Sequence, residues 1–498
     1  MSAMLRLGAV AALLLIAGCE AGPDYERPSA PVPAAYKETD PGWKVGQPED
    51  AIDRGAWWSI YRDPILDGLE RQVDVSNQTL KADEAAFRQA EALAANARAG
   101  LFPTLTANAS AQRSRSSTSG GGGGFGGGPI SNQFSLSANA SWTPDLWGSV
   151  RRAIESSEAT AQASAGTLAG ARLSAQGSLA SDYMELRIAD ELKRLLDQAV
   201  TAFADSLRIT QNQYKAGTAA QSDVSQAQAQ VEQTRAQSIA VGISRAQFEH
   251  AIAVLIGKPP SDFSISPAKQ VPGVPAVPPG LPSQLLERRP DIAVAERQMA
   301  AQNAQIGVAE AAFYPTVTLS GDYGVQSSML SKLFTSASRI WAFGSTAAQT
   351  LFDAGARQAT LAAQRAVYDQ TIANYRQTVL SAFQTVEDEL AALRILAQQG
   401  EAAASALKAA REAERVINNQ YLAGTVAYTS VIVAETTALN DAESVVNIRQ
   451  SQLVASVALI EALGGGWNAA ELPSPAKIES DQPLNFSPIP ASDPHPVK

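Results

Sequence analysis

Residues 213–218 of the chain read QYKAGT, and residues 420–425 read QYLAGT. Nearly the same spacing separates three further pairs, which occur in the same order along the sequence: Pro103 and Pro315, Asp145 and Asp353, Gly257 and Gly465. Matched pairs in one order indicate a tandem duplication of roughly two hundred residues, far longer than the roughly 20–50 residues of a solenoid repeat. The sequence therefore predicts two structural modules with one plan.

Both copies of the phrase end a long stretch without proline. Helices are expected over 64–99, 149–214, 220–256, 356–421 and 428–463. A helix of some 65 residues would reach about 100 Å, at about 1.5 Å per residue, and must pack laterally on other helices. Gly217 and Gly424 supply the backbone freedom of a helix stop. Each phrase is therefore predicted to be a hairpin tip, near 214–222 and near 421–428.

Shorter segments alternate polar and apolar residues, which is typical of strands. They cover 103–110, 133–142, 315–325 and, less regularly, 340–352. In the second of them Phe134, Leu136 and Trp142 share one face, and serines with Asn139 share the other. About ten residues is the length that a tilted strand needs to cross a membrane, and small polar side chains suit a water-filled lumen. A soluble β-sandwich is the alternative, but it would need more strands than this largely helical chain offers.

Four strands cannot close a membrane barrel, because the smallest such barrels have about eight. An open sheet edge in lipid leaves backbone groups unpaired. Two chains would give about eight strands and an interior filled by side chains, whereas three or four chains leave a pore. The predicted fold class is therefore an α+β membrane protein, in which several protomers share one β-barrel that continues into a long helical tube.

The N-terminal segment 1–18 has the order of an export signal, with Arg6, an apolar run and small residues before Cys19. Ile16-Ala17-Gly18-Cys19 fits the bacterial lipobox, in which the cysteine becomes the mature N-terminus and carries diacylglycerol and an N-acyl chain such as palmitate. The alternative is an ordinary signal cut nearby, which would leave a free thiol. Glu20 follows the cysteine, not the aspartate that commonly marks inner-membrane retention.

Composition argues against several other classes of protein. The net charge of −10 disfavours nucleic acid as a partner. The histidines are His250 and His495, and no nucleophile–base set accompanies them, so an enzyme is not expected. No His/Cys cluster offers a metal site, and no cofactor beyond the lipid is expected. The glycine-rich run Gly120–Pro129 lacks the lysine and following helix of a phosphate loop, so a surface loop is predicted.

The chain then divides into six predicted segments. They are the export signal (1–18), a lipidated, proline-rich extended arm (19–63), the first module (64–258), a proline-rich linker (259–283), the second module (284–466) and a tail of disorder-like composition (467–498). WWSIYRDP (57–64) is interpreted as aromatic packing followed by a helix start at Asp63-Pro64. ERRPDI (287–292) is interpreted as a helix start at Pro290 with tethering arginines.

Motifs in this order resemble outer-membrane factors of the TolC/OprM/NodT type, and most of all the NodT-like lipoprotein branch. The motifs are Cys19 followed by GPDYERP (22–28), WWSIYRDPILDGL (57–69), SWTPDLWG (141–148), LPSQLLERRPDIAVAERQMAAQNAQIGVAEAAFYPTVTLSG (281–321), LFDAG (351–355) and QYLAGTVAYTSV (420–431). The resemblance implies a homotrimer with a twelve-stranded barrel in the outer membrane, a twelve-helix periplasmic tunnel and an equatorial collar. The arm, the linker and the segment after 463 would form that collar.

The resemblance also implies a function. Members of the family are passive exit ducts of tripartite efflux systems, passing drugs or other small molecules across the periplasm and outer membrane. They dock periplasmic adaptors (membrane fusion proteins) and inner-membrane pumps, often of the resistance–nodulation–division (RND) class. Two alternatives stay open: a duct for type I protein secretion, and a structural coiled-coil lipoprotein, which would lack the alternating strands.

In the family the hairpin tips close the periplasmic entrance, partly through a Tyr–Asp contact within one protomer. The matching residues here are Tyr421 and Asp223, and Tyr214, Gly217, Gly424 and Ser430 complete the predicted gate. The chain has Val426 where some members have arginine, and Ser430 and Val433 where some have acids, so a weaker latch is expected. Replacing Asp223 with alanine is expected to raise leakiness, unless Asp223 only caps a helix. Duplicated tips would give a trimer six similar grooves for an adaptor ring.

Overall fold

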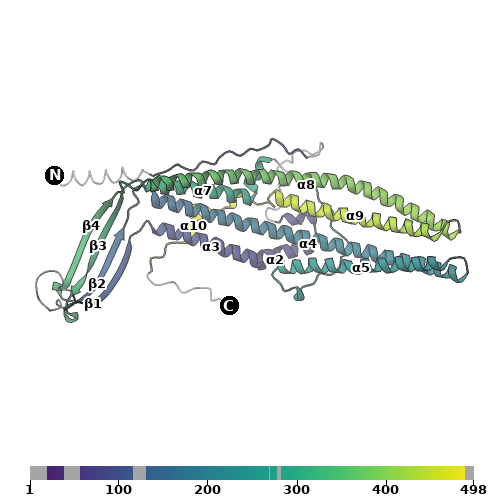
Figure 1. The fold of residues 1–498 in the computed structure, drawn as a ribbon, viewed down its shortest axis with the longest axis horizontal. Helices are drawn as coiled ribbons and strands as arrows, with labels where there is room; N and C mark the ends of the chain where they lie inside the picture. Colours follow the sequence, from purple (N-terminus) through teal and green to yellow (C-terminus); the bar gives the residue numbers. More distant parts are fainter. Residues whose placement is uncertain (1–19, 39–55, 116–129, 269, 278–281, 488–498) are drawn as a thin grey trace.

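The computed structural model describes residues 20–38, 56–115, 130–268, 270–277 and 282–487. The predicted export signal, Cys19 and the glycine-rich run Gly120–Pro129 lie outside the described residues. The molecule is elongated, with its strands at one end and two long helical hairpins reaching the opposite end (Figure 1).

The long helices lie where the sequence predicts them. Their bounds are α4 Ser149–Lys215, α5 Gln221–Leu255, α8 Ala356–Leu422 and α9 Tyr428–Ala462. Helices α4 and α8 each have 67 residues, and α5 and α9 each have 35, so the duplication is preserved in the elements themselves. Among the described residues, no helix is both long enough and apolar enough to cross a bilayer.

The helix predicted over 64–99 is two helices, so that prediction is wrong in its continuity. The bounds are α2 Pro64–Ser76 and α3 Gln78–Ala99. Asn77 between them has an extended backbone, and its side-chain oxygen accepts from the amides of Thr79 (2.9 Å) and Leu80 (3.1 Å). Its side-chain amide donates to the carbonyl of Leu255 at 2.8 Å. An N-cap that also contacts α5 therefore breaks the helix.

The tail also differs from the prediction of disorder. Residues Pro475–Asp481 form α10, and Ser474 caps it by accepting from the amide of Lys477. Ile478 is fully buried against Ala94 of α3 and Ala161 of α4. One apolar side chain that finds a groove between two helices orders this part of the tail. The remaining short elements are α6 Leu285–Arg288, α7 Pro290–Ala311 and the 3-10 turns Trp57–Tyr61, Pro260–Asp262, Pro282–Gln284, Leu330–Lys332, Ser336–Ser338 and Ala469–Glu471.

The strands form a single antiparallel sheet in the order β1-β2-β3-β4. Their bounds are β1 Thr104–Arg115, β2 Ile130–Trp142, β3 Thr316–Ser327 and β4 Arg339–Ala348. Strand β2 of the first module pairs with β3 of the second, with Trp142 opposite Leu319. The outer strands β1 and β4 are exposed along their whole length, and each has one side without a strand partner in the described chain.

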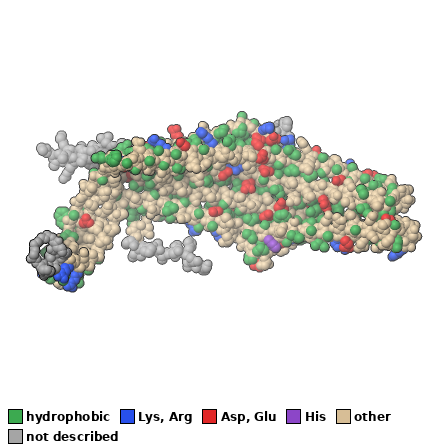
Figure 2. Space-filling model, viewed as in Figure 1, with side chains coloured by type: hydrophobic (Ala, Val, Ile, Leu, Met, Phe, Trp, Pro, Cys, Tyr) green, Lys and Arg blue, Asp and Glu red, His purple; other side chains and the backbone are tan. Residues whose placement is uncertain are grey.

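The main hydrophobic core lies in the helical body, where the predicted aromatic packing of WWSIYRDP is found. Trp57, Trp58 and Tyr61 are buried there, together with residues of α2, α4, α8 and α9. Asp63 caps α2 and also accepts from the Tyr183 hydroxyl at 2.6 Å. On the face drawn in Figure 2, charged side chains gather over the middle of this helical body and few lie over the strands.

Candidate functional site

The repeated phrase builds the same helix stop twice. Gly217 follows α4 with φ +79°, and Gly424 follows α8 with φ +75°. In the first copy the amide of Gly217 donates to the carbonyl of Tyr214 and that of Thr218 to the carbonyl of Gln213, both at 2.9 Å. The second copy repeats both bonds at 2.9 and 3.0 Å. This is a Schellman motif, which satisfies the last carbonyls of a helix and favours glycine at the left-handed position.

A hydrogen bond joins the two tips within one chain. The hydroxyl of Tyr421, on the second tip, donates to the side-chain oxygen of Gln213 on the first tip. The Tyr421 ring packs on Tyr428, with ring centroids 5.3 Å apart. Tyr214, the equivalent residue of the first copy, is 46% exposed. The two copies of the phrase are therefore alike in backbone but unlike in the contacts of their tyrosines.

Asp223 does not make the contact with Tyr421 that the resemblance implied. It lies in the first turn of α5, and its carboxylate accepts from the amide of Ala220 at 3.2 Å. That geometry is one half of a capping box, which turns the carboxylate toward the backbone. Burial first, and then the negative charges of Glu435 and Asp223, raise the pKa of Tyr428.

The second tip lacks the charge of the first. Ser430 occupies the place of Asp223, and its amide donates to the carbonyl of Ala427 at 3.0 Å. Val433, one turn farther along α9, is 65% exposed. These two residues leave an uncharged surface at the positions where some members of the resembled family have acids.

Two residues of this region were missed by sequence reasoning. Gln213 stands inside the repeated phrase, yet its partner Tyr421 comes from the other module, so no local pattern reveals the bond. Glu435 is 4% exposed, and its carboxylate accepts from the hydroxyl of Ser206 on α4 at 2.8 Å. The signal that could have found Glu435 is an acid directly after the apolar run 431–434.

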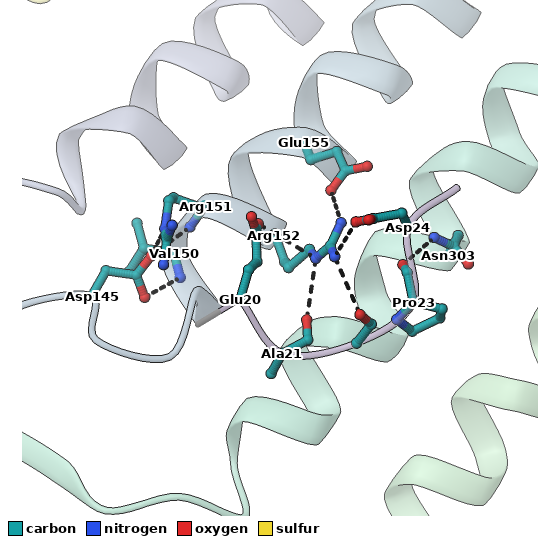
Figure 3. A network of polar contacts seen from close by, with 11 residues as sticks. Glu20, Ala21, Pro23, Asp24, Asp145, Val150, Arg151, Arg152, Glu155 and Asn303 are labelled. Carbon is teal, nitrogen blue, oxygen red and sulfur yellow. Dashed lines mark hydrogen bonds and ion pairs between the residues drawn. The ribbon is translucent and has the colours of Figure 1, made fainter. Parts of the chain in front are cut away.

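The start of the arm is held by Arg152, in the first turn of α4 (Figure 3). Its guanidinium binds Asp24 at 2.9 Å and Glu155 at 2.7 Å, and it donates to the carbonyl of Ala21 at 3.2 Å. The Arg152 side chain is only 4% exposed. Asn303 of α7 adds a bond to the carbonyl of Pro23 at 2.8 Å. Residues 20–24 are thereby fixed beside the junction of the strands and the helical body.

The ERRPDI segment behaves as predicted. Pro290 is the first residue of α7, and Arg289 donates to the carbonyl of Ala462 at the end of α9 (2.9 Å). Within the described residues no group of three His, Cys, Asp or Glu side chains could hold a metal ion.

A duplicated helical body with paired hairpin tips, continuous with an antiparallel sheet whose two edges are open, defines the protomer of an outer-membrane channel with a long periplasmic part. The chain belongs to the family described as Outer membrane efflux protein, whose sequence profile matches residues 69–258 and 281–465.

Individual relatives agree with this assignment. The toluene efflux pump outer membrane protein TtgC of Pseudomonas putida is 31% identical over 457 residues, which are 91% of this chain and 94% of that protein. The probable outer membrane lipoprotein SilC of Salmonella typhimurium is 28% identical over 93% of this chain and 99% of its own length. The solved structure of the outer-membrane channel OprN superposes with a TM-score of 0.82 at 30% identity, covering 90% of this chain and 100% of OprN. This chain is therefore an outer-membrane efflux channel protein of α+β fold.

Proposed function

We propose that three copies of this chain form one exit duct, which a periplasmic adaptor and an inner-membrane pump of the RND class load with small organic molecules. The observation that carries the proposal is the four-stranded sheet with two open edges. Pairing β1 of one copy with β4 of the next removes both edges, which lipid does not tolerate. Three copies give about twelve strands, enough to leave a water-filled lumen.

The periplasmic entrance is the ring of hairpin tips. Each copy supplies two tips with the same backbone turn, so a trimer presents six, a number that suits a six-membered adaptor ring. Within each copy the bond from Tyr421 to Gln213 holds the two tips together. The latch of this channel consists of that bond rather than of a Tyr421–Asp223 contact.

Lipid attached to Cys19 forms a second membrane contact. The Arg152 network supports this part of the proposal, because it fixes residues 20–24 directly after the cysteine, beside the end of the strands. A diacylglycerol at that point enters the bilayer next to the barrel wall. The name of SilC, an outer membrane lipoprotein, supports the same modification.

The proposed cargo class is supported by the name of a relative. The described chain has no metal-ligand cluster, and the name of TtgC specifies toluene as the cargo of its pump. A passive duct needs to admit the cargo, not to recognise it, so the pump selects the molecule.

Conductance of the purified protein in planar bilayers tests the proposal. Wild type is expected to show small, rarely opening currents, and Tyr421→Phe to open more often because the bond to Gln213 is lost. Asp223→Ala is expected to have a smaller effect, since it removes a helix cap worth about 1 kcal/mol. Tyr214→Phe, at the exposed equivalent tyrosine, is the control. Absence of pores from the lipidated, folded oligomer would overturn the proposed channel function.

A further inference from the structure

The two helical hairpins of one chain meet along α4 and α9, just behind the tips. Next to the tips, a small apolar cluster buries Ala227 of α5 with Tyr428 and Val431 of α9, and Leu207 of α4 packs against it. Farther from the tips a second cluster buries Phe203 and Leu439. A separation of the hairpins that starts at the tips must pass through the segment of interface between these two clusters before it reaches the main core.

A carboxyl group sits in that segment. Glu435 of α9 is 4% exposed, and one of its oxygens accepts from the Ser206 hydroxyl of α4 at 2.8 Å. Its other oxygen is fully buried and has no hydrogen-bond partner in the described chain. A buried carboxylate with an unpaired oxygen is costly, whereas a neutral carboxyl is much less so. The packed interface therefore favours the protonated form of this side chain.

The surrounding charges act in the same direction. Helix α8 presents Glu414 to Glu435, and Arg411 of the same helix offsets part of that negative charge. Helix α4 presents the Ser206 hydroxyl to Glu435, and the charged neighbours of Ser206, Asp205 and Arg208, are exposed and pair with each other at 3.3 Å.

The remaining titratable groups nearby are on α9 and α5. Tyr428 of α9 interacts with both Glu435 and Asp223, the acid at the start of α5. No cation among these described residues neutralises Glu435 directly. Burial, and then the charge of Glu414 against the opposing effect of Ser206, raises the pKa of Glu435 to about 7.

We propose that Glu435 is a pH-sensitive interlock: protonated, it lets α4 and α9 pack behind the tips, and ionised, it releases the two hairpins toward the open entrance. The proposal rests on the proposed channel function and names how that entrance is regulated. A channel in the outer membrane is exposed to the pH of the surroundings, so the state of the interlock follows the medium.

The direction of the pH effect on opening follows from proton linkage. When the hairpins separate, water reaches Glu435 and its pKa returns toward the ordinary 4.5. The closed form then binds the proton more tightly than the open form between pH 4.5 and about 7. Raising the pH through this window favours opening, by at most about tenfold per pH unit, and the effect levels off above the pKa of the closed form.

The test is the open probability of single channels in planar bilayers, from pH 5 to pH 8.5. Wild type is expected to open more often as the pH rises toward 7, by up to roughly a hundredfold overall, and then to level off. Glu435→Gln keeps an acceptor for Ser206 and cannot ionise, so its open probability is expected to stay low and constant. Ser206→Ala removes the bond that lowers the pKa, so its profile is expected to move to higher pH.

Glu70→Gln is the matched control. Glu70 of α2 is also buried without a hydrogen-bond partner, and its pKa is raised to about 9, but it lies outside the α4–α9 contact. Its replacement is expected to leave the pH profile of opening unchanged. A Glu435→Gln profile parallel to wild type, or wild-type channels that ignore pH, would overturn the inference alone. Absence of channels from every preparation would overturn the proposed function and the inference together.

Discussion

Arg152 holds the start of the arm through several contacts at once. Arg152→Met removes three ion pairs, with Glu20, Asp24 and Glu155, and also the bonds to the backbone carbonyls of residues 21 and 22. Breaking a fully buried ion pair costs roughly 3–5 kcal/mol. We expect about 2 kcal/mol here, because the Asp24 carboxylate is 94% exposed and water can replace its partner.

Denaturation of the purified protein measures this loss. Arg152→Lys is the matched control, since it keeps a positive charge but lacks the planar fork that reaches several acceptors at once. It is expected to fall between wild type and Arg152→Met. A methionine variant as stable as wild type would show that the arm is held by its other contacts.

At the scale of elements, alanine substitutions at two glycines distinguish the cost of backbone strain from the cost of a steric clash. Gly217 has φ +79° and open space around the position of a Cβ, so Gly217→Ala is expected to cost about 1 kcal/mol. Gly257 has φ +68°, and a Cβ there would lie 2.3 Å from the carbonyl oxygen of Ser76. Gly257→Ala must therefore move backbone as well, and it is expected to destabilise the protein several times more.

Melting temperatures of the two variants, measured side by side, decide this prediction. Gly424→Ala should match Gly217→Ala, because the second tip has the same positive φ and the same open space. Equal losses of melting temperature at Gly217 and Gly257 would mean that the backbone at Ser76 shifts at little cost in free energy. The close approach of α2 to the end of α5 would then be easily relaxed.

The elements also show where sequence reasoning succeeds and where it stops. Long proline-free stretches and alternating segments are local signals, so the four long helices are predicted to within one residue at each end and all the strands are found. The break at Asn77 and the helix at Ile478 are decided by partners distant in sequence, Leu255 and Ala94. The gate follows the same division: the tip turns are local and predictable, whereas the partner of Tyr421 is not.

At the scale of the whole molecule, the open edges of the sheet require several copies of the chain to close one barrel. The duplication supplies two helical hairpins and four strands per chain. The strands of all copies must close into one barrel and their helices into one tube around the same axis. A dimer would give about eight strands, whose interior is filled by side chains, and a tetramer about sixteen. Each copy adds four strands and four long helices, so a trimer has about twelve of each and is the smallest assembly whose barrel leaves a pore.

Native mass spectrometry of the detergent-solubilised protein tests this count. We expect a trimer that resists dissociation, because each pair of neighbours is joined by backbone hydrogen bonds between β1 and β4 in a medium without water to replace them. Unheated samples should migrate as the trimer in denaturing gels and heated samples as the single chain. A dimer or tetramer as the stable species would contradict the barrel proposed here, and a stable monomer would require another structure to cover the edges of β1 and β4.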